Sequence, residues 1–152
     1  LKWFEEPIWP PENLGALTTL RASGIPLAAG ENCPNHFEMQ RMAEVPGLDY
    51  VQPSVTKIGG ITAFHKAATA IELAGKRVAP HSPYFGPGLL ATLHMSALFP
   101  TMEYLEVFGA TLTEPLFDGY GTPEADCTYR IPEGQGLGAD PIPEVVAKYR
   151  IG

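Results

Sequence analysis

Long hydrophobic runs are missing from this chain of 152 residues. No apolar stretch approaches the roughly 20 residues that a membrane-spanning helix needs, so we expect no membrane association. Positive charge is also scarce, with 10 Lys and Arg residues against 17 Asp and Glu residues and a formal charge of -7. That balance disfavours nucleic acid or an anionic membrane surface as a partner.

Cysteine is scarce as well. The two cysteines, Cys33 and Cys127, lie far apart and show no metal-ligand spacing. We interpret both as free thiols in a reducing compartment instead of a disulfide. No secretory leader is recognisable at residue 1, so we expect a cytoplasmic protein.

The chain does contain a repeated unit of strand and helix. The clearest copy begins with an apolar strand ending at Ser54, followed by a Gly59-Gly60 turn, a helix that Gly75 stops, and a strand ending at His81. The helix carries apolar residues on one face at 3.6-residue spacing. These residues are Ile61, Phe64, Ala67, Ala68 and Ile71.

The same unit recurs along the chain, and a polar residue ends each expected strand. These residues are Glu5, Glu31, Ser54, His81 and Glu106, separated by 26, 23, 27 and 25 residues. That pitch fits one strand, one helix and two short loops, and it favours parallel βαβ units. Because the carboxyl ends of parallel strands share one edge, we expect these side chains to converge on a site.

The expected elements are few for a closed barrel. We predict strands over 1–5, 26–29, 50–54, 77–81 and 102–108, and helices over 13–23, 35–44, 61–74, 89–98 and 143–150. A complete β/α barrel takes about 250 residues and eight strands. Either the fold is not a closed barrel, or the chain is the later part of one. From Gly109 onward the strand-helix repeat is no longer recognisable.

Several other residues that could belong to a functional site have a structural interpretation. We interpret His36 as an exposed loop residue, and His65 and His94 as surface or packed helix residues. The glycine-rich segment 133–138 lacks the strand-to-helix context of a dinucleotide site. Taken alone, the pair Glu5-Glu6 is typical of a solvated strand end.

Together the strand-end motifs resemble the enolase superfamily, specifically its mandelate racemase/muconate lactonizing enzyme-like members. The likeness extends over essentially the whole chain. It rests on Trp3-Phe4-Glu5-Glu6-Pro7, Ala29-Gly30-Glu31-Asn32, residues 52–62, Ala79-Pro80-His81-Ser82, Leu105-Glu106 and residues 132–138.

This resemblance implies a TIM-type barrel of seven βα units and a final strand, with a separate capping domain. The five strands would then be the fourth to the eighth. We therefore expect an α/β fold in which residues 1–108 form a partial barrel domain. Residues 109–152 would be a C-terminal tail that packs toward the capping domain.

The resemblance also implies Mg²⁺-assisted removal of the proton α to a carboxylate, giving an enediolate. Such a proton is too weakly acidic for a side-chain base unless the developing oxyanion is neutralised, which a hard cation held by carboxylates can do. Glu5 and Glu31 match two metal ligands of the family. The third ligand, an Asp on the preceding strand, is not in this chain.

The remaining strand ends match substrate-handling residues. His81 matches the general base or acid, and Glu106 the acid that hydrogen-bonds the substrate carboxylate. Tyr84, in the loop after His81, is a candidate pocket residue. Ser54 departs from the family, which has a His-orienting Asp or a Lys base there. We expect His81 to act as an acid in dehydration or to contribute little, with Lys57 in a supporting role.

Two functional hypotheses stay open. The chain is either the C-terminal part of a Mg²⁺-dependent racemase, epimerase or acid-sugar dehydratase acting on a small carboxylate, or a non-catalytic half-barrel that needs a partner chain. In either case we expect the chain alone to be inactive. Exposed sheet edges near 1–5 and 102–108 favour a homo-oligomer or pairing with an N-terminal segment.

Overall fold

The structure, a computed structural model, describes residues 1–151. The chain folds into two compact units. The first unit comprises residues 1–81 and 99–106, and the second comprises residues 82–98 and the chain from 107 onward. The division into a barrel domain over 1–108 and a tail over 109–152 stays a prediction, because these compact units are not domains.

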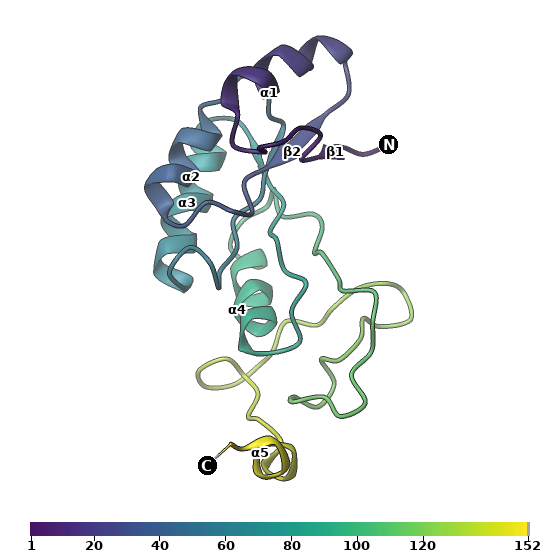
Figure 1. The fold of residues 1–152 in the computed structure, drawn as a ribbon. Coiled ribbons are helices and arrows are strands. Elements are labelled where there is room, and N and C mark those ends of the chain that lie inside the picture. The colour runs from purple at the N-terminus through teal and green to yellow at the C-terminus, as the bar shows by residue number, and fades with distance from the viewer. Residues whose placement is uncertain (152) are drawn as a thin grey trace. The chain divides into compact units, whose positions relative to one another are not determined.

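The first unit is built on a parallel sheet. Its strands are β1 (Phe4–Glu5), β2 (Leu27–Ala29), β3 (Tyr50–Val51) and β4 (Arg77–Val78), in the order β1-β2-β3-β4. Each strand pairs in parallel with the next one along the chain, with Phe4 opposite Leu27 and Val51 opposite Val78. The predicted βαβ repeat is therefore confirmed (Figure 1).

The strands are shorter than predicted, because proline interrupts two of them. Pro53 and Pro80 follow β3 and β4 and have no backbone N–H to donate to a ladder. Single hydrogen bonds nevertheless continue the parallel pairing past the strands. The amide of Gln52 donates to the carbonyl of Ala29 over 3.1 Å, and that of His81 to Pro53 over 3.1 Å.

Side-chain caps start two of the helices in this unit. In α1 (Leu14–Leu20) the Asn13 side chain accepts a hydrogen bond from the amide of Ala16, and in α2 (His36–Ala43) Asn35 accepts two, each at 3.0 Å. Asparagine is a favoured N-cap because its side-chain oxygen satisfies otherwise unpaired amides. The short 3₁₀ helix η1 (Arg21–Ser23) follows α1 and ends at left-handed Gly24.

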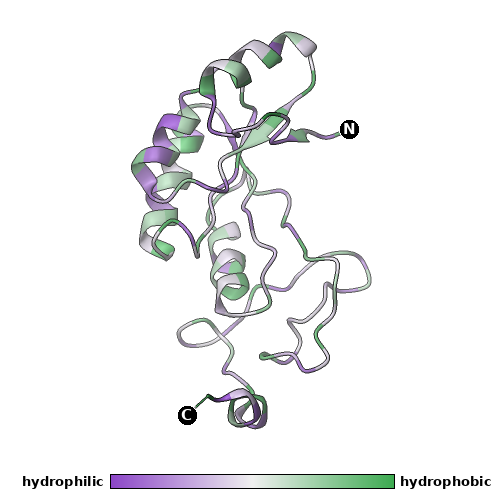
Figure 2. Cartoon of the chain, viewed as in Figure 1, coloured by the Kyte–Doolittle hydropathy of each residue, from purple (hydrophilic) through white to green (hydrophobic). Residues whose placement is uncertain are grey.

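Helix α3 (Ile61–Leu73) supplies much of the core. Phe64, Ala67, Ala68 and Ile71 are fully buried, as their spacing predicts. Ile61 is an exception, with 45% of its surface exposed; it is the first residue of the helix. Helices α2 and α3 pack against each other (Figure 1), and hydrophilic and hydrophobic residues alternate along both (Figure 2).

The predicted strand over 102–108 is wrong, since no described residue there belongs to the sheet. Side chains occupy the edge of β4 that a fifth strand would pair with. The amide of Val78 donates to the hydroxyl of Thr101 over 3.2 Å, and Arg77 pairs with Glu103 over 2.8 Å. The segment therefore runs beside β4 without a backbone ladder.

The second unit holds two helices, α4 (Pro87–Ser96) and α5 (Pro143–Tyr149), and no strand among its described residues. The predicted end of the strand-helix rhythm after Gly109 is confirmed. Hydrogen bonds hold α5 in place: Glu114 accepts from Lys148 and from the hydroxyl of Tyr149, each over 2.7 Å. In addition, the amide of Ile142 donates to Leu116 over 2.9 Å.

Candidate active site at the carboxyl ends of the strands

His81 lies between two carboxylates. Its Nδ1 atom is 2.9 Å from a carboxylate oxygen of Glu31 and 3.0 Å from one of Glu106. The His81 side chain is 11% exposed, whereas that of Glu106 is 40% exposed. Both contacts are close approaches of an imidazole nitrogen to a carboxylate, and neither has the geometry of a hydrogen bond. Three residues that are far apart in the sequence therefore meet at the carboxyl ends of the sheet, as predicted.

Lys57 binds the same glutamate from the other side. Its ammonium lies 3.0 Å from the second carboxylate oxygen of Glu31 and 3.5 Å from the side-chain oxygen of Asn32. Each carboxylate oxygen of Glu31 thus has a basic side chain beside it, His81 at one and Lys57 at the other. The supporting role expected for Lys57 stays a prediction, and the ion pair is consistent with it.

Glu5, on the edge strand β1, lies beside an aromatic cluster. The indole N–H of Trp3 donates to Glu5 over 3.2 Å. The Trp3 ring packs on Tyr50, with ring centroids 4.7 Å apart, and on the edge of Tyr104, at 5.7 Å. Stacking of this kind fixes the indole, which in turn orients the Glu5 carboxylate.

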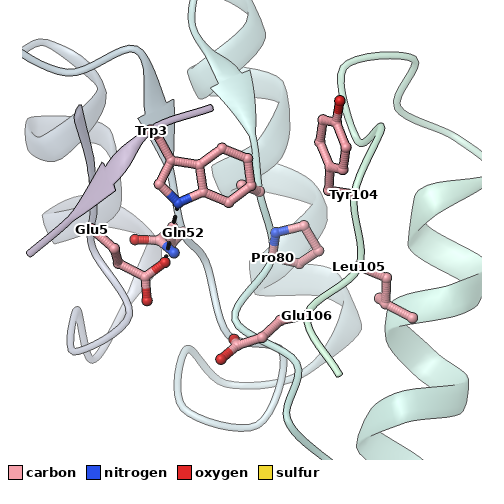
Figure 3. Close-up of a pocket in the computed structure, with 8 residues that line it drawn as sticks. Trp3, Glu5, Gln52, Pro80, Tyr104, Leu105 and Glu106 are labelled. Atoms are coloured by element: carbon pink, nitrogen blue, oxygen red, sulfur yellow. Dashed lines mark hydrogen bonds between the residues drawn. The ribbon is translucent and has the colours of Figure 1, made fainter. Parts of the chain in front are cut away.

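A cavity of about 220 Å³ opens next to this cluster. Figure 3 shows the carboxylates of Glu5 and Glu106 on the same side of it, with the hydroxyl of Tyr104 pointing away from them. The cavity is lined by Trp3, Glu5, Gln52, Ala79, Pro80, Tyr104, Leu105 and Glu106.

Glu6 differs from the solvated residue that the sequence suggested. One of its carboxylate oxygens is buried and has no hydrogen-bond partner among residues 1–151, and its backbone is left-handed, with φ 38°. Burial, and then the negative charges of Glu31, Glu12 and Glu5, raise the pKa of the Glu6 carboxyl. Negative charge is therefore in excess around the ends of β1 and β2.

Gln52 is a second residue that sequence reasoning missed. It is 3% exposed, and its side-chain oxygen has no hydrogen-bond partner within the described chain. The sequence could have indicated Gln52. Side chains two residues apart on a strand share one face, so Gln52 lies on the same face as the inward-facing Tyr50.

Ser54 and Tyr84, the other predicted site residues, belong to different units. Ser54 is buried, and its hydroxyl lies 3.2 Å from that of Thr56. Tyr84 belongs to the second unit, where its amide donates to the carbonyl of Ser82 over 2.7 Å. The catalytic role predicted for Ser54 and the substrate-binding role predicted for Tyr84 both stay predictions.

The donor set fits part of a magnesium site. Oxygen ligands suit Mg²⁺, and a divalent cation would balance the excess negative charge that the buried oxygen of Glu6 reveals. Glu5 and Glu31 would hold it. Across residues 1–151, however, no three His, Cys, Asp or Glu side chains are grouped as metal ligands. The metal-ligand roles of Glu5 and Glu31 therefore stay predictions.

Comparison with known proteins identifies the family of the chain. Residues 1–145 match the family described as "Enolase C-terminal domain-like". The D-galactarolactone cycloisomerase of Agrobacterium fabrum is 30% identical in an alignment that covers 99% of this chain and 42% of that protein. The D-galactonate dehydratase family member RspA of Pantoea ananatis is 34% identical in an alignment that covers 98% of this chain and 36% of that protein.

Solved structures show the same fold. A Pantoea ananatis enolase crystallised with bound D-gluconate and Mg matches with a TM-score of 0.80 and 32% identity, over 99% of this chain and 37% of that one. A mandelate racemase/muconate lactonizing enzyme from Jannaschia sp. CCS1 matches with a TM-score of 0.81 and 28% identity, over 99% and 39%. The predicted fold class, a partial TIM-type barrel, is confirmed.

The chain spans about two fifths of the length of these relatives. The family match extends through almost all of the sequence. The chain therefore belongs to the enolase superfamily, as part of its C-terminal barrel domain.

Proposed function

We propose that this chain is the C-terminal part of a Mg²⁺-dependent enzyme that removes the proton α to the carboxylate of an acid sugar. The observation that carries the proposal is His81, a proton-transferring side chain held between Glu31 and Glu106. The names of the relatives support the substrate class, since they include galactonate dehydratases and sugar-acid cycloisomerases.

Mg²⁺, when bound, would neutralise the negative charge that develops on the substrate carboxylate. Glu5 and Glu31 are the residues of this chain that would hold it. Trp3 keeps the Glu5 carboxylate oriented through its indole N–H. Lys57 forms an ion pair with Glu31 and would share this carboxylate with the cation.

His81 would move the proton. Imidazole can both give and take a proton near neutral pH, and Nδ1 of His81 faces the two carboxylates. His81 then presents its second ring nitrogen as the acid or base. Dehydration, in which His81 acts as the acid, is the reaction we favour over racemisation. Glu106 would bind the substrate carboxylate, and Ser54 would line the site.

A non-catalytic role is the second candidate. It is favoured by the lack of a three-residue metal group in the described chain, and by the two basic side chains that occupy Glu31. On this view the half-barrel pairs with another chain that contributes the missing strands. We propose that the 152-residue chain alone does not turn over substrate.

The experiment uses the protein in its full encoded length, with Mg²⁺ and D-galactonate or D-gluconate. Proton NMR in D₂O follows exchange of the α-proton, and mass spectrometry follows loss of water. His81→Asn should slow the reaction by about 10²- to 10⁴-fold. His65→Asn, on the exposed face of α3, is the matched control and should leave the rate unchanged. Equal rates in the two variants would refute the proposal.

We also propose a cytoplasmic location. No helix within residues 1–151 is both long and apolar enough to cross a membrane. Cys33 and Cys127 are both free thiols, which is the usual state in a reducing compartment.

A further inference from the structure

Thr101 ties the segment that carries Glu106 to two elements of the first unit. Its hydroxyl donates to a carboxylate oxygen of Glu72, in the last turn of α3, over 2.7 Å and accepts from the amide of Val78 on β4 over 3.2 Å. The amide of Thr101 donates to the same oxygen of Glu72 over 3.3 Å. Three partly buried hydrogen bonds therefore hold this one residue against both the helix and the sheet.

The segment that begins at Thr101 runs along β4 and ends at the candidate site. Thr101 contacts Val78 at one end, and at the other end Glu106 lies 3.0 Å from Nδ1 of His81. All four residues belong to the first unit. A shift of Thr101 would therefore be passed along five residues of chain to the Glu106 carboxylate.

The backbone just after Thr101 bonds to its own segment. The amide of Met102 donates to the carbonyl of Phe99, and the amide of Glu103 donates to the carbonyl of Thr101, each over 3.0 Å. Neither amide is used to pair with β4. At this end of the segment, side chains must supply the attachment that a backbone ladder supplies between the strands.

The other side-chain attachment of the segment is more exposed. Glu103 pairs with Arg77 over 2.8 Å and with Lys2 over 3.9 Å, and all three side chains are between 43% and 49% exposed. Ion pairs in such exposed positions contribute little to stability. The bond from the Thr101 hydroxyl to Glu72 has a charged acceptor and is partly buried, so it is the stronger attachment.

We propose that Thr101 is a positioning residue, which sets the place of the Glu106 carboxylate beside His81 through its bonds to Glu72 and Val78. This inference rests on the function proposed above, in which Glu106 binds the substrate carboxylate. Thr101 is not among the residues that line the cavity. It therefore acts through Glu106 and does not touch the substrate. Groups that handle a reacting substrate must be held to within about 0.5 Å, which makes such support necessary.

The kinetic test uses the protein of full encoded length, with Mg²⁺ and D-galactonate or D-gluconate. Thr101→Val keeps the shape of the side chain and removes its hydroxyl, and it should lower kcat/KM by about tenfold. Glu72→Leu removes the partner and should give a loss of similar size. Thr101→Ser keeps the hydroxyl and should recover most of the rate. Thr69→Val, which removes a hydroxyl bonded to His65 within α3, is the matched control and should change nothing.

A double-variant comparison separates positioning from a merely structural role. In a Glu106→Ala background, Thr101→Val should change the residual kcat/KM by less than about twofold, because the carboxylate that Thr101 positions is gone. An equal loss in the two backgrounds would mean that Thr101 supports the fold in general, and it would overturn the inference.

Crystal structures of the wild type and of Thr101→Val, again at full length, test the inference without turnover. A shift of the Glu106 carboxylate away from His81 by about 1 Å or more supports it. An unmoved Glu106, or a regular backbone ladder between residues 102–106 and β4, overturns it. If the wild type does not convert a sugar acid and Glu106 nevertheless shifts, the proposed function fails and the positioning by Thr101 stands.

Discussion

The ammonium of Lys57 lies 3.0 Å from one carboxylate oxygen of Glu31, the residue that resembles a metal ligand of the family. A cation that binds Glu31 must therefore share this carboxylate with a positive charge already in place. The two side chains are 38% and 22% exposed, so solvent reduces the strength of the interaction without removing it.

Replacing Lys57 by Met should strengthen divalent-cation binding in the protein of full encoded length. Removing one positive charge next to the cation is worth about 1 kcal/mol in this partly solvated position, or about a fivefold lower dissociation constant for Mn²⁺. Electron paramagnetic resonance of free Mn²⁺ measures it. Lys57→Arg keeps the charge and serves as the control. Weaker binding in Lys57→Met would show that Lys57 acts mainly by holding Glu31 in place.

Glu114 in the second unit should give a pH dependence. Its hydrogen bonds from Lys148, and then from Tyr149, hold the pKa of the Glu114 carboxyl below its usual range. The folded-state pKa is depressed, so the stabilisation is present above the unfolded pKa and is lost as pH falls through the folded pKa. Carboxyl-carbon NMR should show Glu114 titrating below pH 4.5, and Lys148→Met should move the midpoint upward. An unchanged midpoint would argue against the contact in solution.

Gly47 should tolerate no side chain. A Cβ atom there would collide with the carbonyl oxygen of Leu17 and lie 2.8 Å from the Cα of Thr18, both parts of the α1 backbone. We expect Gly47→Ala to lower the free energy of unfolding by about 3 kcal/mol, because helix and loop must move apart. Urea unfolding measures this.

Gly75 provides the comparison for Gly47. Its φ is +71°, yet a Cβ atom added at Gly75 would have no other atom within 4 Å. Gly75→Ala should therefore cost only the strain of a left-handed residue, about 1 kcal/mol. Equal losses in the two variants would mean that the close approach of Gly47 to α1 does not exist in solution.

The two thiols should react at very different rates. Cys33 is buried, and burial, followed by the charge of Glu38, raises the pKa of its thiol to about 11. Because the thiolate is the reactive form, Cys33 should be inert to Ellman's reagent at pH 8 until the chain unfolds. Exposed Cys127 should react at once. Rapid reaction of the remaining thiol in folded Cys127→Ser would contradict the burial of Cys33.

The open edge of β1 should promote association of the 152-residue chain. Within the described residues β1 ends the sheet, and Phe4 on this strand is 50% exposed. Sedimentation should show concentration-dependent oligomers, which Phe4→Lys should weaken by about tenfold, because charge on an edge strand opposes pairing. Leu73→Lys, exposed on α3, is the control. A monomer at every concentration would refute this expectation.

Much of the fold could be predicted from the sequence, because the relevant signals are local. The helix over 35–44 followed from Asn35 as a cap, and α3 followed from the spacing of Phe64 and Ile71. Strand lengths were overestimated, since Pro53 and Pro80 end the ladder early. The strand over 102–108 failed because Thr101 and Glu103 bind β4 through side chains, which no hydropathy pattern reveals.

The candidate site was predicted in part. The convergence of Glu31 and His81 followed from the strand period, because parallel topology turns a repeat in sequence into proximity in space. Glu106 reaches the same place from a segment that forms no strand. The unpaired oxygens of Glu6 and Gln52 did not follow from it. Whether a buried oxygen finds a hydrogen-bond donor depends on which residues pack around it in the folded chain. The identity of the residue alone does not tell this.

The sequential order of β1 to β4 has a consequence for how the first unit is made. Each strand needs only the strand just before it, some two dozen residues upstream, so loops that close during assembly stay short. The sheet can grow one βα step at a time as the polypeptide leaves the ribosome, without waiting for a distant segment to arrive.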